Sequence, residues 1–446
     1  MSTPETTRSE TLHRAAPPLD PAARRRGRRL AIASHPAGMT HRMVFTDQLP
    51  TLALVALGAS ETLVGIQRSF GPAGALLQLP TLRAIARFPK RTLLLAGHCV
   101  ALAGGIPLLF FGGLERLPAE LGTAIVLASL AVVALGFAMG ETVWFPILRG
   151  YVEPDRVGRF FGTLRTGWHI ALIVYFIGAQ RWLSSHPGSF APLFAVGFGL
   201  GLLRIALIAR LPERSERTGQ RIRVREAIAL LRHESRLRRY LLSVSLSGAV
   251  ARTALPFAIV MMRRALDLSA SQVLLTTIAT FCGGLLALYP SGRIVDRVGP
   301  APLLRWTSIG MALLLFGLLA VREPGTGALP PMVAFFFAYS ALFAGFGVAD
   351  TDVLFNLAPG HAPARLIVIS AVTVNVVTAA TPIIAGLALE WALARWHEPL
   401  AVYHGFFVVA ALVQGFAFLP LRRFRRESLE RDEPESADRD GANPVR

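Results

Sequence analysis

The chain has 446 residues, of which 53% are hydrophobic and 17% charged, and its mean hydropathy is +0.49. This composition is too apolar for two ordinary water-soluble domains and indicates a membrane protein with many spans. The formal charge of +18 lies mostly in arginines between apolar runs, so we attribute it to orientation in a membrane and expect no nucleic-acid partner.

The first 30 residues are polar and basic, and we expect a disordered cytoplasmic tail over residues 1–30. Beyond them, apolar runs recur along the chain, and about 20 such residues cross the hydrocarbon as a helix. These runs lack the alternation typical of strands. In chain order they lie near residues 31–57, 62–82, 92–114, 120–145, 160–184 and 188–210, and then 240–262, 269–290, 302–321, 330–355, 366–391 and 400–421. The sequence therefore predicts an all-α integral membrane protein with twelve transmembrane helices.

The first run is the least apolar, because it contains His35, His41, Arg42 and Asp47. A charge at a helix centre costs about 2.5–3.5 kcal/mol on insertion. We keep this run as a span because arginines crowd one side of the predicted membrane, whereas the other side carries about one per loop, such as Arg68. Both termini then lie on the crowded side. We expect a multi-pass protein of the cell (inner) membrane with both termini cytoplasmic.

The spans divide into two groups of six, which predicts an N-terminal bundle over residues 31–211 and a C-terminal bundle over residues 240–421. Between them, residues 212–239 mix Arg and Glu around an apolar stripe at helical spacing. This pattern is typical of an amphipathic helix on the inner leaflet, here a linker. Residues 422–446 have almost nothing to bury, and we expect a disordered cytoplasmic tail.

Two loops of the first half match loops of the second half in the same order. Pro80–Arg87 aligns with Pro290–Arg297, each directly after the second span of its half. A looser match sets Pro154–Arg159 against Pro359–Arg365, after the fourth span of each half. Two matches in one order favour parallel six-helix repeats.

Residues 292–299 read Gly-Arg-Ile-Val-Asp-Arg-Val-Gly and resemble the G-x-x-x-D-R-x-G loop after helix eight of the major facilitator superfamily of secondary transporters. The equivalent loop after helix two, the loop at residues 153–159 and the long central linker support this resemblance, which covers residues 31–421. It implies two pseudo-symmetric six-helix bundles that move a small solute by alternating access. The loop after helix two departs from the family pattern, with Leu82, Ala86 and Pro89 in place of Gly, Asp and Gly.

Five residues of the second-half motif form a candidate conformational latch: Gly292, Arg293, Asp296, Arg297 and Gly299. Glycines give a tight cytoplasmic turn its backbone freedom. Asp296 could accept hydrogen bonds from backbone amides or from the two arginines, and this contact could break as the halves rock. The alternative is a capped structural turn with arginines on the inner side, and the sequence leaves both open.

Ionisable side chains inside spans are costly, so they usually face a cavity or a partner and point to function. They occur here in the first, fourth, seventh and tenth spans, the helices that line the central cavity in the family that the chain resembles. The candidates for the substrate or proton pathway are Arg42, Asp47, Glu141, His169, Arg252 and Asp350.

Arg252 lies about a dozen residues into its run, near mid-membrane at about 1.5 Å per residue. It could anchor a substrate, or it could form a structural ion pair with Asp47 or Asp350. Asp350 and Asp352 point about 200° apart on a helix, so only one of them can face the cavity, and both could instead reach the inner surface.

Glu141 is predicted near the inner third of its span, where Arg165 or His169 of the next span could pair with it. Such a carboxylate is a candidate proton carrier, and an inert ion pair between two helices is the alternative. His169 could relay protons near neutral pH, or it could be a satisfied packing residue.

Several functions are excluded by missing motifs. The one lysine, Lys90, belongs to no nucleotide-binding loop, and neither a hydrolase elbow nor a zinc-protease motif occurs. Cys99 and Cys282 are isolated, so we expect no metal site. With none of these motifs present, we also expect no cofactor and no enzymatic activity. We predict a monomeric secondary transporter of a small anionic or zwitterionic solute, coupled to protons, in a lipid bilayer. The alternative is a transporter-like membrane sensor or assembly partner that binds a ligand without moving it.

Overall fold

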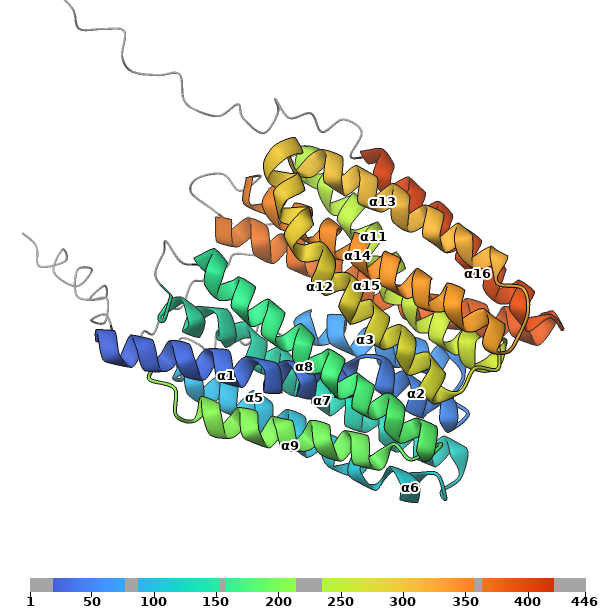
Figure 1. Ribbon diagram of the computed structural model, residues 1–446, viewed down its shortest axis with the longest axis horizontal. Helices are drawn as coiled ribbons and strands as arrows, with labels where there is room; N and C mark the ends of the chain where they lie inside the picture. Colours follow the sequence, from blue (N-terminus) through green and yellow to red (C-terminus); the bar gives the residue numbers. More distant parts are fainter. Residues whose placement is uncertain (1–18, 77–86, 153–156, 214–234, 357–362, 421–446) are drawn as a thin grey trace, which may run out of the picture.

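The computed structural model describes residues 19–76, 87–152, 157–213, 235–356 and 363–420, and every regular element in these ranges is helical (Figure 1). The first half contains α1 (Pro21–Thr46), α2 (Gln48–Ala56), α3 (Glu61–Leu76), α5 (Lys90–Gly105), η3 (Ile106–Phe110), α6 (Phe111–Leu114), α7 (Ala119–Arg149), α8 (Val157–Ser185) and α9 (Ala191–Ile208). The second half contains α11 (Ser235–Arg264), α12 (Ala270–Val298), α13 (Pro300–Gly317), η5 (Leu318–Ala320), η6 (Thr326–Ala328), α14 (Leu329–Asn356), α15 (Pro363–Arg395) and α16 (Pro399–Phe418).

The predicted all-α membrane fold is confirmed. In the described ranges, ten helical segments are long and apolar enough to cross a membrane, and they coincide with ten of the predicted spans. The other two predicted spans coincide with α1 and α2 together and with α3, which is consistent with twelve crossings. Neither is long and apolar enough by the same measure, because α1 carries polar and charged residues along its length, including Arg42, and α3 has 16 described residues.

The first helix begins earlier than the sequence predicts. It starts at Pro21, so the expected disordered tail over residues 1–30 is wrong for its last part. Asp20 caps the helix by accepting a hydrogen bond from the amide of Ala23 at 2.6 Å, and Pro21 occupies the first helical position. Hydropathy marks where a chain enters the hydrocarbon, whereas capping residues mark where a helix begins, and here the two points differ.

Other predicted segments lie wholly or partly outside the described residues. These are the remainder of the N-terminal tail, the loop after the second span, the tip of the loop at residues 153–156, most of the linker and the C-terminal tail. Residues 235–239, at the end of the predicted linker, already belong to α11. The amphipathic linker helix and the disordered C-terminal tail stay predictions.

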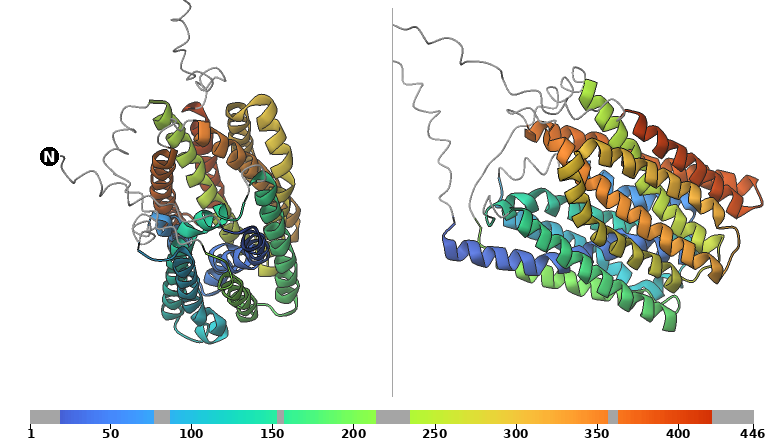
Figure 2. Two further views of the ribbon diagram at one scale, coloured as in Figure 1. Left: turned by 90° about the vertical axis from the view of Figure 1, so that its left-hand side faces the viewer. Right: turned by 45° about the horizontal axis from the view of Figure 1, so that its top comes forward.

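The helices form two bundles that meet along two pairs of helices. Within the first half, α1 packs on α9 and α5 on α7, and within the second half α12 packs on α14 and α13 on α16. Between the halves, α3 lies against α15 and α8 against α12. Figures 1 and 2 show these pairs running side by side where the blue-to-green half meets the yellow-to-red half. The space between the remaining faces of the two halves holds the site described below.

The α3–α15 contact is close because glycines leave no side chain between the backbones. A methyl group at Gly65 of α3 would collide with the carbonyl oxygen of Pro382 in α15. At Gly386 of α15, a methyl group would lie 2.5 Å from the carbonyl oxygen of Glu61. Small residues are the usual means by which membrane helices approach so closely.

Candidate functional site

A cavity of about 630 Å³ lies between the two halves, midway along the helices. Its wall receives side chains from α1, α2, α3, α7 and α8 of the first half and from α11, α12, α14 and α15 of the second half. The charged and titratable residues that line it are Arg42, Asp47, Arg68, Glu141, His169 and Arg252. Five of these six are predicted site residues. The size is within the usual range for small-molecule sites.

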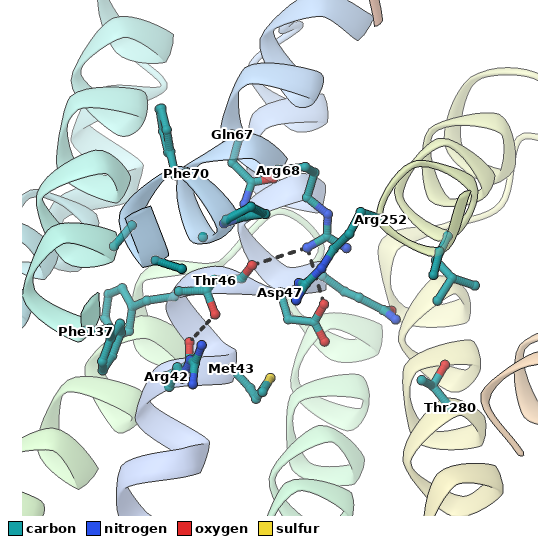
Figure 3. A pocket seen from close by; sticks show the side chains of 18 of the residues that line it. Arg42, Met43, Thr46, Asp47, Gln67, Arg68, Phe70, Phe137, Arg252 and Thr280 are labelled. Carbon is teal, nitrogen blue, oxygen red and sulfur yellow. Dashed lines mark hydrogen bonds and ion pairs between the residues drawn. The ribbon is translucent and has the colours of Figure 1, made fainter. Parts of the chain in front are cut away.

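Asp47 lies at the break between α1 and α2, in a backbone conformation that belongs to neither helix (φ −107°, ψ −125°). Because α1 ends there, the carbonyl of Thr46 has no helical partner and is open to a side-chain donor. Arg68 of α3 supplies one: its Nη1 donates to the Thr46 carbonyl at 3.2 Å and to Asp47 Oδ1 at 3.3 Å (Figure 3). The break therefore places a carboxylate and an arginine side by side at the cavity.

Arg68 is a site residue that the sequence reasoning missed. We assigned it to an outer loop edge, which is wrong: it lies within α3, and its side chain is 11% exposed. The signal available was its position six residues inside the predicted second span, where an arginine is as costly as the charges that we did select.

Arg42 and Glu141 form an ion pair across the cavity from α1 to α7. Both side chains remain about one-third exposed, at 32% and 38%. The sequence offered Arg165 or His169 as partners for Glu141, and the structure instead selects Arg42. His169 also lines the cavity, where its Nδ1 lies 2.8 Å from the carbonyl of Arg165 one helical turn earlier.

Arg252 of α11 is the cavity arginine without a direct partner. Its side chain is exposed although it lies in the middle of a membrane-spanning helix. Within the described residues, no hydrogen bond or ion pair holds it, and Asp47 attracts it through space. Figure 3 shows the side chains of Arg68 and Arg252 converging on Asp47. With three arginines and two carboxylates, the cavity has an excess of one positive charge when His169 is neutral.

Asp350 does not reach the cavity. Its carboxylate accepts a hydrogen bond from the Tyr240 hydroxyl at 2.5 Å, inside the second half. Asp352 is not among the lining residues either, and its electrostatic neighbour is Asp296 of α12. The expectation that one of the two aspartates faces the cavity is therefore wrong, because the rotation of α14 turns Asp350 toward α11.

The latch motif forms the end of a helix instead of a turn. Residues 292–298 continue α12, and only Gly299 has a positive φ, of 83°. Gly292 is helical, so its backbone freedom is not used there. Arg293 lies over the ring of Tyr289 at 4.4 Å, and no described arginine pairs with Asp296. The corresponding first-half loop lies outside the described residues, so the latch role stays a prediction.

A second polar cluster, which the sequence reasoning also missed, lies inside the first bundle. Arg204 of α9 is 5% exposed and donates to the Ser34 carbonyl at 2.8 Å and to His98 Nε2 at 3.3 Å. Its guanidinium lies 4.1 Å from the centroid of the Trp144 ring. Gly38 makes room for it, since a methyl group there would lie 2.5 Å from its Nε. This arginine therefore joins α1, α5, α7 and α9.

One end of the cavity is closed by contacts between the halves. Glu61 at the start of α3 is 3% exposed and accepts hydrogen bonds from Arg264 at 2.5 Å and from the Tyr403 hydroxyl at 2.8 Å. The amide of Thr62 donates to Glu390 at 3.3 Å, and the Thr277 hydroxyl donates to Gln48. Glu61 begins α3 and Arg264 ends α11, so their contact lies at helix ends, whereas Gln48 lines the cavity itself.

The family model described as Major Facilitator Superfamily matches residues 240–443. No curated protein matches the sequence.

Among solved structures, the nucleoside transporter NupG has a TM-score of 0.67 and 14% identity, covering 90% of this chain and 100% of its own. A D-xylose-proton symporter has a TM-score of 0.64 and 15% identity, covering 87% and 96%. A bacterial homologue of the iron transporter ferroportin has a TM-score of 0.66 in an inward-facing state, at 16% identity and covering 88% and 99%. The score for such a homologue in an outward-facing state is 0.57. At these identities, the likeness shows a shared fold.

Proposed function

We propose that this chain is a secondary transporter that moves a small solute by alternating access. Its resemblance to the major facilitator superfamily, confirmed by the family model and the shared fold, supports this proposal. The observation that carries this proposal is a charged cavity at mid-membrane depth, between two six-helix halves whose contacts close it at one end. Such a cavity offers a site that either end of the molecule could expose in turn.

The charge of the cavity supports an anionic or zwitterionic solute. Its three arginines exceed its two carboxylates, and Arg252 has no direct partner among the described residues. The structural neighbours named for nucleosides, xylose and iron carry solutes that are not typical anions. We therefore take the fold from these neighbours and the solute class from the side chains.

The described conformation supports an inward-facing state. Five arginines lie in the first turns of α1, and this cluster supports a cytoplasmic location for that end of the molecule, in a cell (inner) membrane with both chain termini inside. The closed end, with Glu61 and Arg264, is then the outer one.

Proton coupling would use the cavity carboxylates Asp47 and Glu141. Each faces a cavity arginine, so binding of a proton would release that arginine, and this change could be linked to solute binding. His169, which lines the same cavity, is a further group that could exchange a proton.

The test begins with a thermal-shift screen of the purified protein in detergent against anionic, zwitterionic, neutral and cationic metabolites at two pH values. A ligand at about 100 times its dissociation constant adds about 2.7 kcal/mol of stability. Each hit is then tested for uptake into proteoliposomes with an imposed proton gradient. We expect an anion or zwitterion to accumulate, and we expect an amide at one of the two cavity carboxylates, Asp47→Asn or Glu141→Gln, to abolish uphill accumulation while binding persists.

Glu115→Gln, at an exposed loop position outside the cavity, is the matched control and should transport normally. Accumulation that survives Glu141→Gln removes this residue from the coupling proposal. A ligand that binds but never crosses the membrane favours the alternative, a transporter-like sensor or assembly partner. Light scattering of the detergent-solubilised protein tests the expected monomer.

A further inference from the structure

The carboxylate of Asp47 lies between two arginines that belong to different halves of the molecule. Arg68 comes from α3 of the first half and donates to Asp47 Oδ1 at 3.3 Å. Arg252 comes from α11 of the second half, and its strongest favourable electrostatic interaction is with Asp47. Arg68 and Arg252 are also near enough to repel each other. Asp47 thus separates two like charges that would otherwise face each other.

Two guanidinium groups that converge on one carboxylate make an anion-binding cradle, because arginine forks match the geometry of carboxylate oxygens. The carboxylate in this cradle belongs to the protein itself. It is not buried beyond reach, since the Asp47 side chain is 27% exposed and lines the cavity. Asp47 is also the residue that joins α1 to α2, so its backbone does not belong to a continuous helix.

We propose that Arg68 and Arg252 form the binding site for the anionic group of the solute, and that Asp47 occupies this site when no solute is bound. Protonation of Asp47 then frees the two arginines to bind the solute. This inference rests on the proposed transport function and gives that function a solute class, a monoanion. The solute anion would replace Asp47 as the bridge between the two halves.

Charge balance explains the coupling. A proton converts the Asp47 carboxylate into a neutral acid, which removes one negative charge from the cradle, and one bound monoanion restores it. One proton and one anion therefore enter together, and the net charge of the cavity is unchanged. A proton alone would leave two arginines facing each other without a counter-ion, at high cost in a medium of low dielectric. This cost opposes movement of a proton without the solute.

The other charged groups of the cavity do not provide the same exchange. On α1, Arg42 is paired with Glu141 of α7. On α8, His169 lies beside the carbonyl of Arg165. The lining residues from α12, α14 and α15 carry no charge, and they include Thr280, Ser340 and Asn375. Among the described lining residues, Asp47 is thus the carboxylate that faces two arginines.

The wall around the cradle indicates what the rest of the solute resembles. Aromatic rings line the cavity from both halves, among them Trp168 of α8, Phe281 of α12 and Phe343 of α14. Such rings favour an apolar or planar body beside the anionic group. Benzoate has this composition, and benzamide is its uncharged counterpart, so this pair is a suitable set of probes.

The experiment measures benzoate binding to the full-length protein in detergent by isothermal titration calorimetry, between about pH 6 and pH 8, where a free carboxylate stays ionised. In the wild type, we expect affinity for benzoate to fall about tenfold for each unit of rise in pH, because one proton enters with each anion. Benzamide should not bind. A flat pH profile for the wild type, or benzamide binding equal to that of benzoate, overturns the proposal.

The Asp47→Asn variant removes the internal competitor and the proton site together. It should bind benzoate with an affinity independent of pH and at least about tenfold higher than the wild type near pH 8. Adding Arg252→Gln to this variant should weaken binding about tenfold or more. Glu115→Gln, a carboxylate outside the cavity, should retain the wild-type profile. Absence of benzoate binding to Asp47→Asn overturns the proposal, since two unpaired arginines would then line the cavity without attracting an anion.

Proteoliposome uptake separates this inference from the proposed function. If a metabolite from the screen accumulates in proteoliposomes but benzoate binding is independent of pH, the transport proposal stands and the cradle exchange is wrong. If binding follows the expected pH profile and no solute crosses the membrane, the cradle is supported and transport is wrong. Should Asp47→Asn fail to fold, the pH profile of the wild type still decides the outcome.

Discussion

Two arginines lie deep inside membrane-spanning helices of this protein, Arg204 in α9 and Arg252 in α11, and their surroundings are opposite. Arg204 is 5% exposed and is held by a carbonyl, a histidine and an aromatic ring. Arg252 is exposed to the cavity and lacks a direct partner among the described residues. A cation that is satisfied by neutral neighbours fixes helices together, whereas a cation that no side chain contacts directly is available to a ligand. The same residue type is therefore structural in one place and functional in the other.

The largest effect on stability is expected from Arg204→Ala. This change leaves His98 and the Ser34 carbonyl without their donor and opens a void between four helices, which should cost about 3 kcal/mol. Thermal unfolding in detergent measures the loss. Solute binding per folded molecule should be unchanged, and loss of binding without loss of stability would show that Arg204 belongs to the solute site.

Arg252→Ala should have the reverse outcome. Removing one charge-assisted contact to an anion should weaken binding by about 1.5–3 kcal/mol, or roughly tenfold to a hundredfold. The unfolding temperature should stay the same or rise slightly, because a charge without a direct partner leaves the membrane interior. Calorimetric titration of the anion found in the screen measures the first quantity. A fall in unfolding temperature as large as that of Arg204→Ala would show that Arg252 is structural as well.

Replacement by lysine sharpens the comparison, because lysine keeps the charge and loses the planar fork. At Arg204, the contact over the Trp144 ring and the paired donors would weaken, which should cost about 1–2 kcal/mol of stability. At Arg252, the charge alone attracts an anion, so Arg252→Lys should keep most of the affinity that Arg252→Ala loses. Parallel melting and binding curves for the two lysine variants test this difference.

The smallest effects are expected from the aromatic neighbours. Trp144→Phe keeps a smaller ring beneath Arg204 and should lower stability by about 1 kcal/mol without altering binding. Trp168→Leu changes a ring that lines the cavity and should weaken solute binding with little change in stability. If the Trp144 variant lost binding and the Trp168 variant lost stability, the Arg204 cluster and the cavity would not have separate roles.

Much of the architecture could be predicted from the sequence because it depends on properties that are local in the chain. Long apolar runs predict helices that satisfy their own backbone, and these helices are present. The orientation inferred from the arginines stays a prediction. Charges in spans one, four and seven pointed to the cavity, and Arg42, Asp47, Glu141 and Arg252 do line it. Each of these inferences needs only the spacing along one helix.

What could not be predicted depends on how helices rotate against each other. The partner of Glu141 is Arg42, far away in sequence, and the packing of α14 on α12 and α13 leaves Asp350 facing Tyr240 of α11. Arg68 gained its role from the helix break at Asp47, which leaves the Thr46 carbonyl open to it. Sequence spacing fixes which residues share a face of a helix, but it does not fix which neighbour that face meets.

The glycine contacts between α3 and α15 have a mechanical consequence for the closed end. Because Gly65 and Gly386 bring bare backbone against backbone, the two surfaces have no interlocked side chains there and can separate cleanly. The same flush fit makes the joint intolerant of added bulk. A side chain at either position would act as a wedge between the helices. Under the proposed transport function, a single added methyl group would therefore hold the two halves apart at this end.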